Sequence, residues 1–252
     1  MKLRALFVGC ALILGGCASA PNQETVDDYE DARDPLESVN RKVWDFNRDV
    51  LDAYILKPTA NVYQDVMPQP VRKGLHNMAQ NLEEPSTVVN DLLQAKFLKA
   101  LEDTSRFVLN STVGVLGLFD VAKEVGLERR HEDFGETMGV WGVGEGPYLM
   151  LPAMGPTVPR QAVGDFVDTL YFPLADLTFW PSLFRMGVNT LETRISLMDQ
   201  EGLLENSLDP YNFVKDAYYQ NLLNQVYDGN PPINEEEYED FDEELEDLEE
   251  EF

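Results

Sequence analysis

The chain has 252 residues, 44% of them hydrophobic and 26% charged, which is enough for one sizeable core or two small ones. Lys and Arg total 19 against 46 Asp and Glu, and the formal net charge of -27 argues against nucleic acid as a partner and against electrostatic binding to an anionic membrane. Two Cys and two His exclude a thiolate zinc cluster, so we expect no metal and no cofactor.

The N-terminus has the composition of a bacterial secretion signal. A basic head is followed by the apolar residues 5–14, a stretch shorter than the roughly 20 residues of a membrane-spanning helix. The following sequence, Leu14-Gly15-Gly16-Cys17, matches the lipobox, in which the cysteine thiol is acylated and the chain is cut before it. We therefore predict a lipoprotein signal peptide over residues 1–16 and a lipidated Cys17. A plain secretory signal is the alternative.

Two polar segments flank the predicted folded domain. Residues 17–33 comprise the lipidated cysteine and a polar, acidic linker without helical periodicity. At the other end, 13 of the 18 residues from Glu235 to Phe252 are acidic. Like charges this dense repel one another and stay hydrated, so we predict an acidic disordered tail over residues 229–252.

Residues 34–228 show helical periodicity and predict one all-α domain. The first helix is expected to begin with Asp34 as N-cap and to end near Lys57-Pro58. Asp209-Pro210 has the same cap pattern and predicts the start of the last helix. Apolar residues at steps of three and four predict the helices between them, over residues 71–82, 88–93, 97–108 and 184–198.

The segment from Phe134 to Pro156 differs from the rest, with six Gly and three Pro among its 23 residues. This composition argues against an ordinary helix and allows a short hairpin. The segment is also too apolar for an ordinary surface loop. We expect it to be buried under its own side chains or to face something other than water.

Motifs for covalent chemistry are missing from the sequence. No G-x-S-x-G elbow and no P-loop occur, and His131-Glu132-Asp133 lacks the second His of a zinc protease motif. A surface or capping role accounts for His76 and His131, although a triad assembled in space stays open. The sequence therefore favours a protein that is not an enzyme.

Aromatic residues next to prolines suggest contact with a membrane surface. Phe172, Phe179 and Trp180 lie in two such clusters and are candidates for the membrane interface, with core packing as the alternative. If they face lipid, the protein lies in the plane of the membrane and does not cross it.

Arg185 is a further candidate because it interrupts an apolar neighbourhood. On a helix it shares a side with Asn189, Glu192 and Ser196. This polar side either faces water or lines a channel in which Arg185 meets lipid phosphate.

Several segments, taken together and in order, resemble the MlaA (VacJ) lipoproteins of Gram-negative outer membranes. The resemblance covers most of residues 34–228, and the chain departs from the pattern at Glu136, where Gln is expected, and at Glu145 in the Gly-rich loop. The segments that carry it are Asp34-Pro-Leu-Glu37, Asn40-Arg41, Phe46-Asn47, Lys57-Pro58, Pro70-Val-Arg72, Asn81-Leu-Glu-Glu-Pro85, Asn90, Asn110-Ser-Thr112, Phe134-Gly135, Gly142-Val-Gly144, Gly146-Pro-Tyr148, Leu151-Pro152 and Asp209-Pro-Tyr211.

The resemblance implies an all-helical, ring-like protein with a central amphipathic channel, embedded in the inner leaflet of the outer membrane beside a trimeric porin. It implies that the protein removes mislocalised phospholipids from the outer leaflet and passes them to a soluble periplasmic lipid carrier, which maintains lipid asymmetry. The composition of the Gly-rich segment, together with the polar side of the later helix, gives six candidates for the lipid conduit: Trp141, Gly142, Gly144, Gly146, Tyr148 and Arg185.

Two other classes of function stay open. The protein is a lipid-cleaving enzyme that acts on the same substrates, or a structural adapter that tethers a porin to a partner. Release of fatty acid distinguishes the enzyme, and an unimpaired outer membrane after substitution of Gly144 distinguishes the adapter.

Overall fold

A computed structural model describes residues 31–171, 173–177 and 179–232. The chain divides into two units, of which the account below concerns the second, Ala32–Phe252, in its described residues. The predicted signal peptide, Cys17, most of the linker, and the tail beyond residue 232 lie outside the described residues.

The second unit is almost entirely helical, as the sequence predicts. Among the described residues, one antiparallel hairpin pairs β1 (Leu149–Leu151) with β2 (Gly155–Thr157), in agreement with the short hairpin that the composition of the Gly-rich segment allows. The helical elements are α2 (Glu37–Asp45), η1 (Phe46–Leu56), α3 (Lys57–Val66), α4 (Gln69–Asn81), α5 (Glu84–Leu93), α6 (Phe97–Thr112), α7 (Val121–Glu124), α8 (Phe134–Val140), α9 (Pro159–Asp168), η2 (Leu174–Asp176), α10 (Phe179–Met198), α11 (Glu201–Glu205) and α12 (Pro210–Val226).

The first helix does not end at Lys57-Pro58, and this prediction is wrong. The chain passes from α2 into the π-helix η1 and continues as α3. Where the hydrogen-bond spacing changes from π to α, Pro58 falls in the first turn of α3, a position that tolerates a residue without an N–H.

Asp34 does not cap this helix, contrary to the prediction. The N-cap is Leu36, which has no side-chain cap. The buried carboxylate of Asp34 instead accepts hydrogen bonds from Asn40 Nδ2 at 2.7 Å and from the hydroxyl of Tyr211 in α12. Partners distant in the sequence therefore satisfy Asp34 and tie the start of the domain to its last helix.

The other predicted helix start is confirmed. Asp209 is the N-cap of α12 and accepts from the backbone N–H of Tyr211 at 3.0 Å. The helices predicted between the first and the last helix are also found, as α4, α5, α6 and α10.

A short helix in the Gly-rich segment contradicts the expectation that this segment is not helical. Asp133 caps α8 through a hydrogen bond from the N–H of Glu136 at 2.7 Å. The glycines serve close packing, since a Cβ on Gly164 of α9 would lie 2.2 Å from the backbone nitrogen of Gly135. Two helices can approach this closely only where neither carries a side chain.

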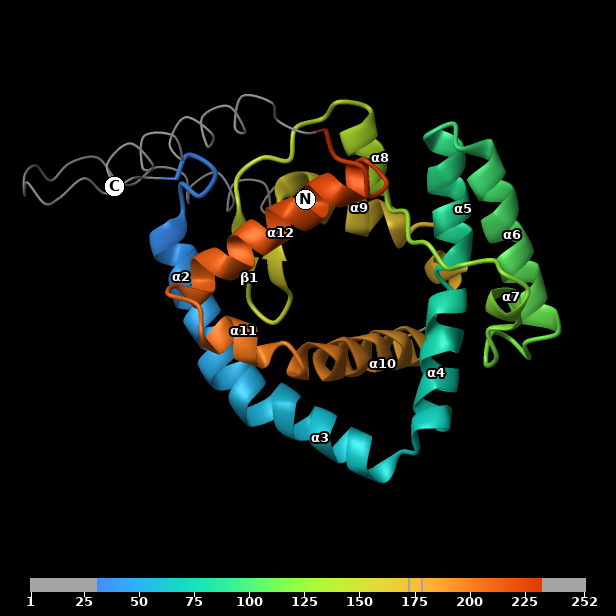
Figure 1. The fold of residues 1–252 in the computed structure, drawn as a ribbon, viewed down its shortest axis with the longest axis horizontal. Coiled ribbons are helices and arrows are strands. Elements are labelled where there is room, and N and C mark those ends of the chain that lie inside the picture. The colour runs from blue at the N-terminus through green and yellow to red at the C-terminus, as the bar shows by residue number, and fades with distance from the viewer. Residues whose placement is uncertain (1–30, 172, 178, 233–252) are drawn as a thin grey trace, which may run out of the picture. The chain divides into compact units, whose positions relative to one another are not determined.

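The helices of this unit form a closed circuit, which agrees with the predicted ring (Figure 1). α10 packs against both α3 and α4, and α12 packs against α8 and α11. The circuit closes where Arg41 of α2 pairs with Asp209 before α12, at 2.7 Å. The central channel implied by the resemblance stays a prediction.

Polar and charged residues outnumber hydrophobic residues among the buried side chains of the described chain. One aromatic cluster, around Tyr148, Tyr211 and Tyr219, supplies most of the buried apolar core. Many large apolar side chains of the described residues are instead exposed, including Phe46, Val50, Phe97, Leu98, Leu116, Phe166, Phe179 and Trp180. This distribution is inverted relative to a water-soluble domain.

Within the described ranges, none of the helices combines the length and the apolar content needed to cross a membrane.

Candidate lipid-binding site

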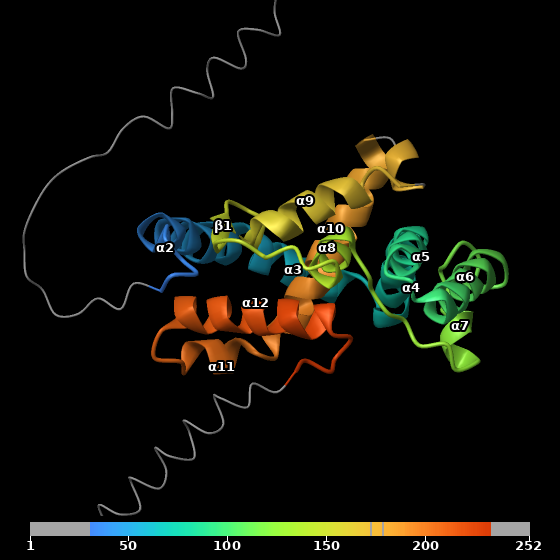
Figure 2. The same ribbon diagram turned by 90° about the horizontal axis from the view of Figure 1, so that it is seen from above.

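A groove of about 640 Å³ lies between the β-hairpin, α9 and α12, and is called the α9–α12 groove below. Figure 2 shows α9 and α12 one above the other beside the hairpin. Its volume falls in the range of roughly 300–1,000 Å³ typical of sites for small organic ligands. The residues that line it are Leu151, Met154, Pro156, Thr157, Gln161, Ala162, Asp165, Phe166, Thr169, Tyr218, Asn221, Leu222 and Gln225.

The lining is amphipathic. Leu151, Met154 and Pro156 of the hairpin form an apolar wall, which Phe166 and Leu222 extend onto the two helices. The same helices contribute the polar residues Gln161, Asp165, Asn221 and Gln225. A groove of this kind can accept a molecule that has both an apolar and a polar part.

Two asparagines of the first helical segment hold the hairpin wall in place. Asn40 donates to the carbonyl of Tyr148 at 3.0 Å and accepts from the N–H of Met150 at 3.0 Å. Asn47 does the same at the tip, where it donates to the carbonyl of Leu151 at 2.9 Å and accepts from the N–H of Ala153 at 2.9 Å. Each amide replaces a missing neighbouring strand.

The base of the hairpin is anchored in the aromatic core. Tyr148 is 0% exposed, and its ring packs edge-on against Tyr211 at a centroid distance of 5.9 Å. Burial raises the pKa of the Tyr148 hydroxyl above its ordinary value. The structure therefore places this conduit candidate in the core.

The other candidates of the Gly-rich segment lie closer to the surface. Trp141 is 53% exposed, and its ring packs edge-on against Phe134 at a centroid distance of 5.8 Å. Its Nε1 donates to the carbonyl of Leu93 at 3.2 Å. No atom lies within 4 Å of a Cβ placed on Gly142 or Gly144, apart from their own chain neighbours.

Gly146 is placed differently, since a Cβ there would meet Pro159 at 3.1 Å. Among the described residues that line the α9–α12 groove, none is one of the six conduit candidates. Their role in a conduit stays a prediction.

Arg185, the sixth candidate, is paired with a carboxylate. Its Nη1 lies 2.6 Å from Oε1 of Glu83, and Asn189 donates to the same oxygen at 2.9 Å. One turn further along α10, Glu192 lies 3.4 Å from Arg72 of α4. The polar side of α10 thus faces charged partners on and beside α4.

Two of the three membrane-interface candidates are described. Phe179 and Trp180 are 69% and 73% exposed, and their rings pack edge-on with a centroid distance of 5.1 Å. Their exposure does not agree with the alternative of core packing. Phe172 lies outside the described residues.

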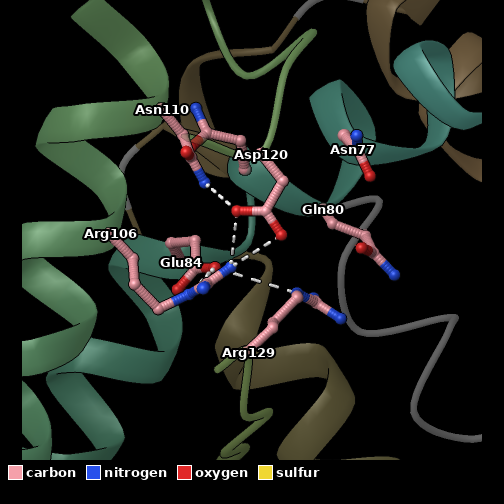
Figure 3. A pocket seen from close by; sticks show the side chains of 8 residues that line it. Asn77, Gln80, Glu84, Arg106, Asn110, Asp120 and Arg129 are labelled. Carbon is pink, nitrogen blue, oxygen red and sulfur yellow. Dashed lines mark hydrogen bonds and ion pairs between the residues drawn. The ribbon is translucent and has the colours of Figure 1, made fainter. Parts of the chain in front are cut away.

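A second, much smaller pocket is polar, and residues of α4, α5, α6 and the segments on either side of α7 line it. Figure 3 shows Arg106 next to Glu84 and Asp120, and Arg129 Nε lies 3.8 Å from Oε1 of the same Glu84. Its volume of about 10 Å³ suits a single water molecule and not a lipid. Burial raises the pKa of Glu84 to about 7 even though Arg106 lies nearby.

His131 is half-exposed, and its Nε2 lies 4.0 Å from Oδ2 of Asp133. His76 hydrogen-bonds to Gln80 within α4 at 2.7 Å. His131 thus has the surface position favoured by the sequence. His76 is partly buried within α4, away from both of its caps, and this position differs from the predicted surface or capping role.

The groove residues on α9 and α12 were not predicted from the sequence. A signal for them exists on α12, where Tyr218, Asn221, Leu222 and Gln225 follow one another at helical spacing. This stripe mixes polar and apolar residues, so it matched neither an ordinary core stripe nor a solvated face.

Comparisons with known proteins agree with the resemblance found in the sequence. The model of the MlaA lipoprotein family matches residues 32–225. The intermembrane phospholipid transport system lipoprotein MlaA of Escherichia coli (strain K12) is 40% identical over 87% of this chain and 86% of its own length. The protein of the same name from Haemophilus influenzae is 36% identical over 87% of this chain and 88% of its own length.

A solved structure described as the structural basis for maintenance of bacterial outer membrane lipid asymmetry has a TM-score of 0.73 and 44% identity. It covers 78% of this chain and 99% of its own length. The chain therefore belongs to the MlaA lipoprotein family.

Proposed function

We propose that this protein is an outer-membrane lipoprotein that removes phospholipids from the outer leaflet and passes them toward the periplasm, which maintains lipid asymmetry. The names of its relatives, lipoproteins of an intermembrane phospholipid transport system, support this proposal. The observation that carries it is the amphipathic α9–α12 groove in a domain with an apolar outer surface.

The outer surface suits a protein that lies within one leaflet. Phe179 and Trp180 are exposed, together with other apolar residues such as Phe46. The transfer of such side chains, Leu98 among them, from water into hydrocarbon lowers the free energy. We place the protein in the inner leaflet of the outer membrane, facing the periplasm and anchored through a lipidated Cys17.

The groove provides what passive lipid movement requires. Two acyl chains contain roughly 30 methylenes, and keeping them out of water is worth on the order of 25 kcal/mol. A polar headgroup in hydrocarbon costs several kcal/mol or more. Apolar Leu151 and Phe166 line the groove together with polar Gln161 and Asn221, a combination that would lower both costs along one path.

The transfer needs no covalent chemistry and no bound nucleotide, so we infer that the protein is not an enzyme. We expect a trimeric porin beside it in the membrane and a soluble periplasmic carrier that receives the lipid. Crosslinking from the exposed residues Phe179 and Trp180 tests contact with the porin.

Filling the groove tests the proposal. Ala162 is an exposed residue of α9 that lines the groove, so Ala162→Trp adds bulk there at little cost to folding. Val163, its exposed neighbour, does not line the groove, and Val163→Trp is the matched control.

Both variants are expressed in a Gram-negative host that lacks its own MlaA-family protein. Outer-leaflet phospholipid is then measured with an amine reagent that does not cross the membrane. Ala162→Trp should leave outer-leaflet phospholipid as high as in the host without the protein, and Val163→Trp should restore asymmetry. Full restoration by Ala162→Trp would refute a lipid path through the groove.

A further inference from the structure

The formal charge of the residues that line the α9–α12 groove is of one sign, negative. Among the described residues that line it, Asp165 is the one with a formal charge at neutral pH. The other polar lining residues are amides, hydroxyls and a phenol, and none of them is Lys or Arg. An anionic headgroup therefore finds no cationic partner in this lining.

The nearest arginine of α9 is directed elsewhere. Arg160 is buried and donates from Nη1 to the carbonyl of Val143 in the Gly-rich segment, at 3.1 Å. It is not a lining residue.

The carboxylates of Asp133 and Asp168, close to Asp165, strengthen the negative potential there. Gln161 Nε2 bridges Asp165 Oδ1 at 2.9 Å and Asp133 Oδ2 at 2.8 Å. Desolvation raises the pKa of Asp165 above its ordinary value. The charges of Asp133 and Asp168 add to this effect, whereas the hydrogen bond from Gln161 and the nearby His131 act against it. A cation next to Asp165 would relieve this repulsion, and an anion would add to it.

The groove also offers neutral donors for a phosphate. The amide groups of Asn221 and Gln225 line it, and the amide of Asn221 donates to Oε1 of Gln225 at 3.1 Å. These groups can bind a phosphate ester without a compensating charge, which suits a headgroup whose phosphate is already balanced by an ammonium.

We propose that Asp165 makes the groove selective for phospholipids whose headgroup carries an ammonium group, such as phosphatidylethanolamine, over net anionic phospholipids, such as phosphatidylglycerol. This inference rests on the proposed function, because it assigns the headgroup preference of the same site. Asp165 is then a specificity-determining residue, and its contribution is electrostatic.

The test uses the full-length protein purified in a mild nonionic detergent. It is incubated with vesicles of dioleoyl phosphatidylethanolamine and dioleoyl phosphatidylglycerol in equal amounts, re-isolated, and its bound lipids are quantified by mass spectrometry. The variants are Asp165→Asn and, as the matched control, Asp176→Asn, which removes an exposed carboxylate that does not line the groove.

The native protein and Asp176→Asn should bind phosphatidylethanolamine with an enrichment of about two- to fivefold over the vesicle ratio, the range of one partly exposed charge pair. Asp165→Asn should bind the same total amount of lipid with the enrichment lost. Bound lipid at the vesicle ratio in the native protein, or enrichment that survives in Asp165→Asn, would overturn the headgroup preference and leave the proposed function standing. Absence of bound lipid from the native protein would overturn both.

Discussion

Arg185 of α10 donates from Nη1 to Oε1 of Glu83, in the turn between α4 and α5, at 2.6 Å. Glu83 also lies 3.3 Å from Arg129, so one carboxylate links α10 to the segment that follows α7. The pair explains why an arginine occurs among the apolar residues in the first half of α10, since it provides a charged contact between two sides of the circuit.

Removing this pair should destabilise the protein. Arg185→Ala leaves Glu83, which is mostly buried, with weaker partners, and we expect a loss of about 1 kcal/mol in the free energy of unfolding. Denaturant unfolding of native protein, Arg185→Ala, Glu83→Gln and the double variant measures the coupling between the two residues. Unchanged stability together with impaired lipid transport would instead support direct contact of Arg185 with lipid.

The hairpin tip should loosen when Asn47 is truncated. Asn47→Ala removes the acceptor of the Ala153 N–H and the donor to the Leu151 carbonyl, at a cost of roughly 1 kcal/mol per hydrogen bond. The amide hydrogen of Ala153 should then exchange with solvent about tenfold faster.

Asn61→Ala on the exposed surface of α3 is the control for this experiment and should leave the exchange of Ala153 unchanged. An unaltered rate in Asn47→Ala would mean that the β-pairing alone holds the tip.

Glu136 should make stability fall as the pH rises. Desolvation, followed by the charges of Asp133 and Glu132, raises the pKa of buried Glu136 to about 9. In the unfolded chain its pKa is about 4.3. Between these values the folded protein holds a proton that the unfolded chain releases, so stability decreases through this window.

Glu136→Gln removes this titration and keeps the shape of the side chain. At pH 8 the variant should exceed the native protein in the free energy of unfolding by on the order of 1–3 kcal/mol, and at pH 4 the two should be equal. Thermal unfolding across this range measures the difference, with Glu128→Gln on the surface as the control. A difference that does not change with pH would contradict the burial of an uncharged Glu136.

Asp209 combines two contributions that substitutions can separate. Asp209→Asn keeps a good N-cap for α12 and loses the ion pair with Arg41, whereas Asp209→Ala loses both. We expect Ala to cost about 1 kcal/mol more than Asn in the free energy of unfolding.

The hydrogen bond from Arg41 lowers the pKa of Asp209, so its stabilising effect is present above the unfolded pKa of about 3.9 and is lost at lower pH. Urea unfolding at pH 7 and pH 3 measures both effects. If Asp209→Asn and Asp209→Ala lose the same free energy of unfolding at pH 7, the N-cap of α12 contributes nothing to stability.

Helical periodicity in the sequence was sufficient to predict the all-α class and most of the helices. The apolar steps of α4 and α10 and the cap at Asp209 are local signals, and local hydrogen bonding produced the elements that they predict. Local signals failed where a distant partner competed. Asp34 was expected to cap a helix, but it binds Tyr211, which is 177 residues away in the chain.

The groove became visible only in the tertiary structure. Asp165 and Asn221 have no common motif, and the packing of the hairpin, α9 and α12 brings them to one cavity. The sequence also does not show which side of an amphipathic helix faces outward. In a domain with many buried charges, such as Arg106 and Asp103, the apolar side of a helix can face outward, because the paired polar groups fill the interior.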